Sequence, residues 1–183
     1  MDNPLVIIAL LSIGLALFFA VQARAQRRHA SAEDKVMKGY FLLGLSGLMA
    51  KIAMADGQVT DDESALAIRF FKGMDLTDAE RAICIGNFVS SRRDELTARD
   101  HARRFLAYAN GTACEFLYDL LWRLSLADGT VAPAEDELLL SVADYLGLSH
   151  KIYENFKAGK RPNYDQGALA AAGVPPSLLA LVG

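Results

Sequence analysis

Apolar positions recur at helical spacing along residues 31–158, and short polar clusters separate the apolar faces. Several clusters begin with Thr and carry Glu three positions later, as at Thr60–Glu63 and Thr77–Glu80. Such capping boxes mark helix starts, and a glycine such as Gly57 marks a helix end. No stretch shows the convincing two-residue alternation of a β-strand. The pattern predicts an all-α fold, a bundle of about seven helices.

The caps and glycines also give the expected helix limits. The first helix is long and apolar and runs from Ser31 to Ala55. Its glycines at 39, 44 and 47 each weaken it unless another helix packs closely there. The other expected helices cover residues 60–73, 77–91, 97–110, 112–127, 133–147 and 149–158. Their shared apolar face is expected to include Phe41, Leu45, Ile68, Phe71, Phe105, Phe116, Leu120, Leu124 and Leu139.

One sequence phrase occurs twice, at residues 48–63 and 120–135. In each copy an apolar helical run ends in Ala-Asp-Gly and continues with a spacer, a Val, three residues and a Glu. An offset of 72 residues (129 minus 57) relates the two copies throughout. It matches Asp56, Gly57, Val59 and Glu63 with Asp128, Gly129, Val131 and Glu135. The repetition predicts a duplicated helix–loop–helix unit with two pseudo-equivalent halves.

Helix capping explains most of the acidic residues in these two turns. Glu63 and Glu135 stand at the N3 position, where a carboxylate meets free backbone N–H groups and the positive end of the helix dipole. Asp61, Asp62 and Asp136 favour the same first helical turns. On this interpretation the acidic residues stabilise helix starts and have no further role.

Asp56 and Asp128 need another explanation, because the C-terminal end of a helix disfavours a carboxylate. If pseudo-twofold packing brings the two turns together, they gather the carboxylates of Asp56, Asp62, Glu63, Asp128, Glu135 and Asp136. Such a cluster predicts either a weak divalent-metal site, for Ca or Zn, or a surface for a basic protein partner. The partner-binding residues would be Asp56, Asp61, Asp62, Asp128 and Asp136.

Two other kinds of site are excluded. The spacing from glycine to glutamate also occurs in the second half of an EF-hand loop, but both copies hold apolar residues where the first two calcium ligands would stand. None of the three histidines, His29, His101 and His150, has a Cys, Ser or carboxylate at a recognisable catalytic or metal spacing. There is no phosphate-binding glycine loop. We therefore do not expect an enzyme.

Residues 4–23 carry no charge, and about twenty helical residues span the roughly 30 Å of a bilayer core. A basic linker follows at residues 24–30, so the positive-inside rule places the N-terminus outside and the rest of the chain in the cytoplasm. A cleaved signal peptide is the alternative, disfavoured because no Lys or Arg precedes the apolar run. Close pairing of two such membrane helices, and hence a homodimer, is predicted through a face of small residues, Ser12, Ala16 and Ala20.

Composition bears on the kind of partner and on the cellular compartment. The formal net charge of −3 includes the basic linker, so the rest of the chain is more acidic still, and nucleic acid is not an expected partner. Cys84 and Cys114 lie in apolar helical sequence outside any CxxC pair, which suits a reducing compartment. Residues 159–183 form a linker and an uncharged apolar tail.

The repeated Ala-Asp-Gly-x-Val…Glu turn resembles the hallmark of the TerB family of tellurite-resistance-associated helical domains. With the apolar segment and basic flank, the order of parts is similar to that of the membrane-anchored DnaJ-like co-chaperones of the DjlA type. This resemblance covers about residues 4–158 and implies a TerB-like domain over 31–158 at the bacterial inner membrane. Residues 164–177 resemble the opening of a J domain, so the tail is either a vestigial J domain or unrelated to one. The chain contains no His-Pro-Asp tripeptide, through which a J domain stimulates its DnaK partner.

Two functional hypotheses follow. The first is a single-pass, membrane-anchored TerB-like interaction or scaffold module, related to DjlA-type co-chaperones but without J-domain activity, whose protein partner the sequence does not identify. The second, which the TerB resemblance implies, is a divalent-metal-binding stress-response protein.

Overall fold

The computed structural model describes residues 36, 38–74, 76–107, 109 and 111–162. The predicted membrane span at 4–23, the basic linker and the apolar tail lie outside the described residues. No helix among the described residues is long and apolar enough to cross a membrane. Backbone contacts divide the chain into Met1–Lys38 and Gly39–Gly183, and the helical bundle lies within the second unit.

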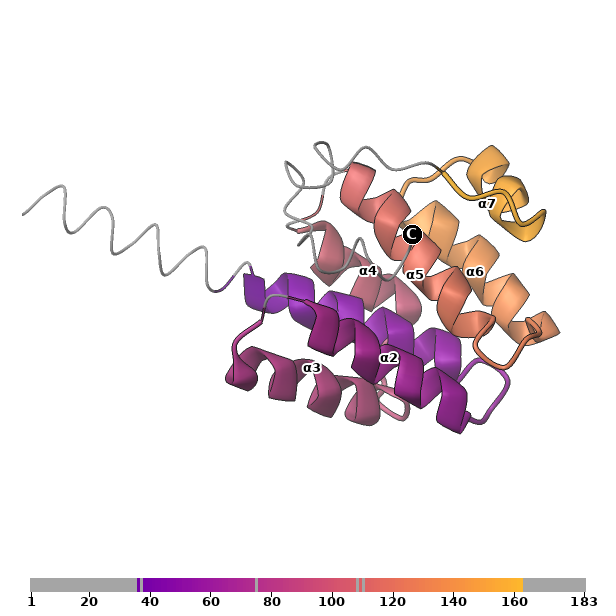
Figure 1. Cartoon of the computed structure of the whole chain (residues 1–183). Helices are drawn as coiled ribbons and strands as arrows, with labels where there is room; N and C mark the ends of the chain where they lie inside the picture. The colour runs from indigo at the N-terminus through magenta and orange to yellow at the C-terminus, as the bar shows by residue number, and fades with distance from the viewer. Residues whose placement is uncertain (1–35, 37, 75, 108, 110, 163–183) are drawn as a thin grey trace, which may run out of the picture. The chain divides into compact units, whose positions relative to one another are not determined.

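The described part of this unit is all α-helical, with seven helices and no strand, as predicted (Figure 1). A helix over residues 39–53 comes first. The others are α2 (Asp61–Gly73), α3 (Asp78–Ser91), α4 (Ala98–Leu106), α5 (Gly111–Ser125), α6 (Pro133–Tyr145) and α7 (His150–Lys157). The expectation that the fourth helix continues to residue 110 is wrong, since α4 ends at Leu106.

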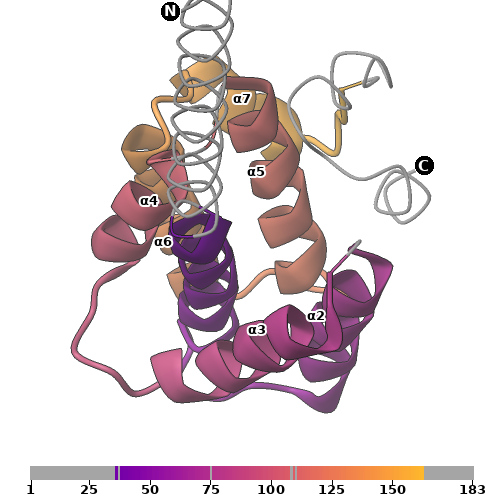
Figure 2. The same cartoon turned by 90° about the vertical axis from the view of Figure 1, so that its left-hand side faces the viewer.

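The duplication extends over three helices. A shift of 72 residues takes the end of the 39–53 helix to the end of α5, the start of α2 to that of α6 and the start of α3 to that of α7. Each half is therefore a three-helix unit. The helix α4 has no counterpart among the described residues under this shift. It links the two halves along the chain and packs against α6. Figures 1 and 2 both show α2 and α3 at one end of the bundle and α7 at the other.

Two glycines let α4 pack closely on the 39–53 helix. A methyl group added at Gly44 would collide with the backbone of Phe105, and one at Gly47 would collide with the ring of His101. Close helix packing therefore offsets the cost of Gly44 and Gly47 to the helix. Gly39 has no such neighbour, because a Cβ atom there would meet no atom within 4 Å.

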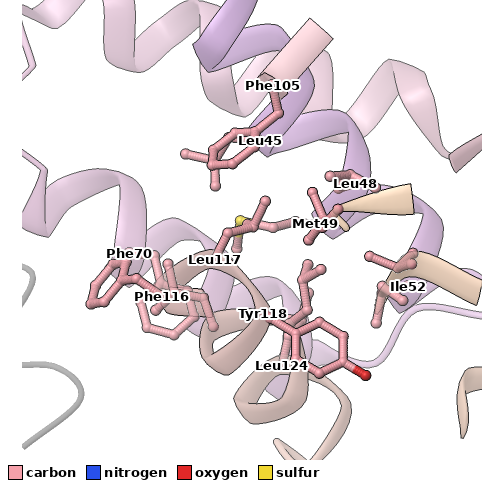
Figure 3. Packing of buried hydrophobic residues seen from close by; sticks show 14 of the residues in the cluster. Leu45, Leu48, Met49, Ile52, Phe70, Phe105, Phe116, Leu117, Tyr118 and Leu124 are labelled. Atoms are coloured by element: carbon pink, nitrogen blue, oxygen red, sulfur yellow. The ribbon is translucent and has the colours of Figure 1, made fainter. Parts of the chain in front are cut away.

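The core lies between the two halves (Figure 3), where the 39–53 helix and α5 contribute much of the buried apolar surface. Its central side chains include Leu48, Met49, Phe70, Leu117, Tyr118 and Leu124, each at most 1% exposed. Of the predicted apolar face, Phe41 packs against this core while half-buried, and Ile68 is also half-buried. The others on that face are buried.

A buried polar group accompanies the contact of α4 with the 39–53 helix. His101 is fully buried, and its Nε2 lies 3.7 Å from an oxygen of Asp94, whose other oxygen lies 2.7 Å from Nζ of Lys51. Burial would raise the pKa of Asp94, but the hydrogen bond and charge of Lys51 lower it. Burial lowers the pKa of His101, so the ring sits neutral in the core. No feature of the sequence pattern indicated this burial.

We predict that Gly44→Ala destabilises the fold by about 2 kcal/mol, because the added methyl group would displace α4. The matched control is Gly86→Ala, in the interior of α3, where an added Cβ meets nothing within 4 Å. That change should stabilise the fold by up to about 1 kcal/mol, the difference in helix propensity. Thermal unfolding followed by circular dichroism measures both. Equal effects of the two substitutions would contradict the close helix contact.

Candidate interaction site at the two acidic turns

The first turn reverses the chain between the 39–53 helix and α2. Gly57 has a φ of +97°, a backbone conformation that favours glycine. The backbone N–H of Gln58 donates to Oδ1 of Asp56 over 3.1 Å. Next, Glu63 Oε2 accepts from the backbone N–H of Thr60 at 2.7 Å, and the Thr60 hydroxyl oxygen accepts from the backbone N–H of Glu63 at 3.2 Å. The predicted capping box is confirmed.

The second turn repeats this geometry with one difference. Gly129 again has a φ of +97°, and the backbone N–H of Thr130 donates to Oδ1 of Asp128 over 3.0 Å. The backbone N–H of Ala132 donates to Oε2 of Glu135 over 2.8 Å. Ala132 has no hydroxyl group, so only the glutamate half of the box is present.

These contacts explain why an aspartate recurs before each glycine. Each side chain accepts a hydrogen bond from the N–H group two residues further on, which is the geometry of an Asx turn. Asp56 and Asp128 therefore fix the turn itself, a role that their sequence positions alone did not indicate. Both side chains remain exposed.

The two turns lie side by side where the 39–53 helix and α5 end, on the right in Figure 1. The capping glutamates are buried there, with Glu63 5% and Glu135 6% exposed. Burial raises the pKa of Glu135 to about 7 against the opposing hydrogen bond from Ala132, and the charges of Glu63, Asp56 and Asp128 raise it further. The predicted meeting of the two turns is present in the structure.

The remaining predicted residues lie differently. Asp136 points to α7, where it accepts hydrogen bonds from the hydroxyl of Tyr153 at 2.9 Å and from Nζ of Lys157 at 2.6 Å. Asp61 and Asp62 are exposed in the first turn of α2. Within the described ranges, no three Asp, Glu, His or Cys side chains are grouped so that they could hold a metal ion. The predicted metal site stays a prediction.

A groove of about 460 Å³ adjoins the second turn, and the sequence pattern did not predict it. Its apolar lining comes from α5, α6, α7 and the turn, namely Trp122, Leu126, Val131, Pro133 and Phe156. Gly159 and three charged residues, Asp136, Lys157 and Arg161, complete the lining. Arg161 lies in the segment after α7, so no helical periodicity could have indicated its place.

Arg161 crosses this region and reaches a buried carboxylate. Its Nε lies 3.2 Å from Oδ1 of Asp119, which is fully buried in α5, and Arg123 Nε donates to the other oxygen of Asp119 at 3.3 Å. Burial raises the pKa of Asp119, and the two arginines act in the opposite direction. The sequence holds a signal for the pair of Asp119 with Arg123, because an acidic residue within the apolar run of α5 is followed by an arginine four positions later. It holds no such signal for Arg161.

The fold is thus a duplicated helical domain whose halves each contribute one acidic turn. Residues 42–158 match the family described as "Tellurite resistance protein TerB". The chain belongs to the TerB family, as its repeated turn predicted. No solved structure matches it.

Similar proteins carry the name "Co-chaperone protein DjlA". The chain is 29% identical to that of Aliivibrio fischeri over 104 residues, which are 56% of this chain and 37% of the relative. It is 22% identical to that of Escherichia coli K12 over 137 residues, 74% of this chain and 51% of the relative. For Yersinia pseudotuberculosis the identity is 23% over 134 residues, 72% and 48% of the two chains. The chain thus spans between about a third and a half of the length of these relatives.

We predict that Glu135 makes stability depend on pH. The folded protein keeps the Glu135 proton up to about pH 7, whereas the ordinary pKa is 4.5, so its stabilising contribution is complete below 4.5 and is lost as the pH rises through 7. Glu135→Gln keeps an acceptor for the N–H of Ala132 without this ionisation. The variant should be more stable than the natural protein by at least about 1 kcal/mol at pH 8. Unfolding curves at pH 5 and pH 8 test this, and an unchanged pH dependence in the variant would contradict the burial of Glu135.

Proposed function

We propose that this chain is a non-enzymatic interaction or scaffold module that captures a basic protein partner on its acidic turns. Its TerB-like, DjlA-related character supports an adaptor role, and its surface chemistry supports a basic partner. Residues 4–23 would hold the domain at the cytoplasmic face of the bacterial inner membrane. The apolar length of this segment and the basic linker after it support that location.

The observation that carries the proposal is that the glutamates of the two turns are buried while the aspartates around them are exposed to solvent. Glu63 and Glu135 are buried and cap helices, whereas the exposed acids around them are Asp56, Asp61, Asp62 and Asp128. Because both turns meet, exposed acids from opposite halves form one surface. A partner with several basic residues would contact both turns at once, and grouped charges favour fast, selective association.

Two neighbouring functions receive less support. J-domain activity is not proposed, since the sequence holds no His-Pro-Asp tripeptide. Homodimer formation through Ser12, Ala16 and Ala20 lies outside the described residues and stays a prediction. A dimer would place two acidic surfaces at the membrane, which would strengthen the capture of a partner with repeated basic segments.

The test of this proposal is capture of the partner by charge variants of the full chain. Asp56→Asn with Asp128→Asn removes two charges while leaving an oxygen that can accept the turn hydrogen bonds. We expect crosslinked partner at the membrane to fall at least about tenfold, with the helical circular-dichroism signal unchanged. The matched control is Glu137→Gln with Asp144→Asn, two exposed acids of α6 outside the turns. Equal loss in both variants would indicate a general charge effect and contradict the site.

A second candidate function is divalent-metal binding in a stress response. The observation that favours it is that the charges of Glu63, Asp56 and Asp128 all act on Glu135, so the acids of both turns are near one another, although no three of them are grouped as a metal site within the described residues. The family description, which names tellurite resistance, agrees with a stress role.

Metal binding would raise the thermal unfolding temperature, because a ligand of the folded state stabilises it. On this second hypothesis, Ca or Zn at about 100 times its dissociation constant adds about 2.7 kcal/mol to the stability of the natural protein and nothing to that of the Asp56→Asn, Asp128→Asn variant. Calorimetric melting with and without each ion measures the difference. Identical curves in all conditions would eliminate the metal hypothesis.

A further inference from the structure

The groove beside the second acidic turn is continuous with the proposed recognition surface. Leu126 comes two residues before Asp128 and Val131 comes two residues after Gly129, so residues that flank the exposed aspartate also line the groove. Leu126 is 39% exposed and Pro133 is exposed as well, whereas Trp122 and Phe156 are only 3% exposed and form the deeper part of the groove. A molecule bound to the acidic turn therefore lies next to an open apolar surface.

The charged side chains at the groove form ion pairs within the domain. Asp136 is 2.6 Å from Nζ of Lys157, and Asp119 is 3.2 Å from Nε of Arg161. The Arg161 guanidinium also lies over the ring of Phe156, 4.9 Å from its centroid, and 5.8 Å from that of Trp122. These ion pairs and ring contacts make the groove suited to an uncharged apolar group.

The first half does not carry the same lining. The offset of 72 residues places Ala50 where the second half has Trp122, and Cys84 where it has Phe156. It also places the charged Asp61 opposite Pro133. The aromatic walls are therefore a feature of the second half alone, although both halves share the acidic turn.

We infer that the partner carries one large aliphatic side chain between its basic residues, and that this side chain binds in the groove of Trp122, Leu126, Val131, Pro133 and Phe156. The inference rests on the proposed function, because the basic residues bind the acidic turns. Because the apolar side chain fits the second half and not the first, it fixes the direction in which the partner segment lies across the two turns. The occupant is thus an amphipathic basic protein segment.

Trp122 provides a direct measurement, because it is the only tryptophan in the sequence and lines the groove. The probes are three capped peptides without aromatic residues: Lys-Lys-Ala-Leu-Ala-Lys-Lys, its counterpart with a central Ala, and a version of the Leu peptide with Ser in place of Lys. The full chain in nanodiscs of zwitterionic lipid is titrated with each peptide. Calorimetry reports binding, and the Trp122 emission reports occupation of the groove; empty nanodiscs give the background.

We expect the basic Leu peptide to bind about tenfold more tightly than the Ala peptide and to shift the Trp122 emission. Leu126→Gln should remove this difference between the peptides. Leu106→Gln should keep it, because Leu106 is similarly exposed, at 38%, but lies on α4 and does not line the groove. The Ser peptide should bind at least about tenfold more weakly than the basic Leu peptide.

Each other outcome overturns a separate part. Equal binding of the two basic peptides, lost in the Asp56→Asn, Asp128→Asn variant, would leave the proposed function standing and overturn the groove. The affinity for the Leu peptide could instead stay the same when Ser replaces its lysines and when the protein carries Asp56→Asn and Asp128→Asn. That result would overturn the coupling of groove and acidic turns, and with it the proposed function. Failure of all three peptides to bind would overturn both.

Discussion

The buried carboxyl group of Glu135 is the constraint on which the arrangement of the acidic turns depends. A carboxyl group removed from water must keep its hydrogen bonds, and here the N–H of Ala132 supplies one while the acids of both turns surround it. The position of the second turn is fixed by this contact, since moving it would leave a buried acid without its donor. The exposed Asp128 is held in place by the same short segment. The structure thus joins a buried cap, which stabilises a helix, to an exposed acid that can meet a partner.

Duplication followed by divergence explains how one domain can present a directional surface. Both halves keep the aspartate, the glycine of positive φ and the capping glutamate, because the turn cannot form in this way without them. The halves differ where the turn geometry makes no demand. Thr60 completes its capping box, whereas Ala132 does not, and Trp122 lines a groove where the first half has a buried Ala50. The two similar turns supply negative charge for a basic partner, and the residues that differ between the halves determine which partner segment fits.

Local signals predicted the fold well because helix ends depend on neighbours in sequence. Thr77 and Glu80 placed the start of α3, and the repeated phrase placed the meeting of the turns. Two features that depend on distant residues and have no repeated motif were not predicted. His101 lies among charged residues in α4, yet it is buried because Gly47 leaves room for its ring. The groove was missed because Arg161 reaches Asp119 from beyond the last helix, and sequence spacing carries no information about such a contact.

The most direct test of a single recognition surface is site-specific photocrosslinking in living cells from both turns of the full chain. Gln58 and Thr130 are exposed, and each lies next to the glycine of its turn, so a crosslinking residue at either site would leave the aspartates and capping glutamates in place. A third crosslinker at Ser90, exposed on α3, serves as the reference position. If the two turns form one surface, positions 58 and 130 should give the same partner adduct and position 90 should give none. Different adducts from the two turns, or the same adduct from all three positions, would contradict it.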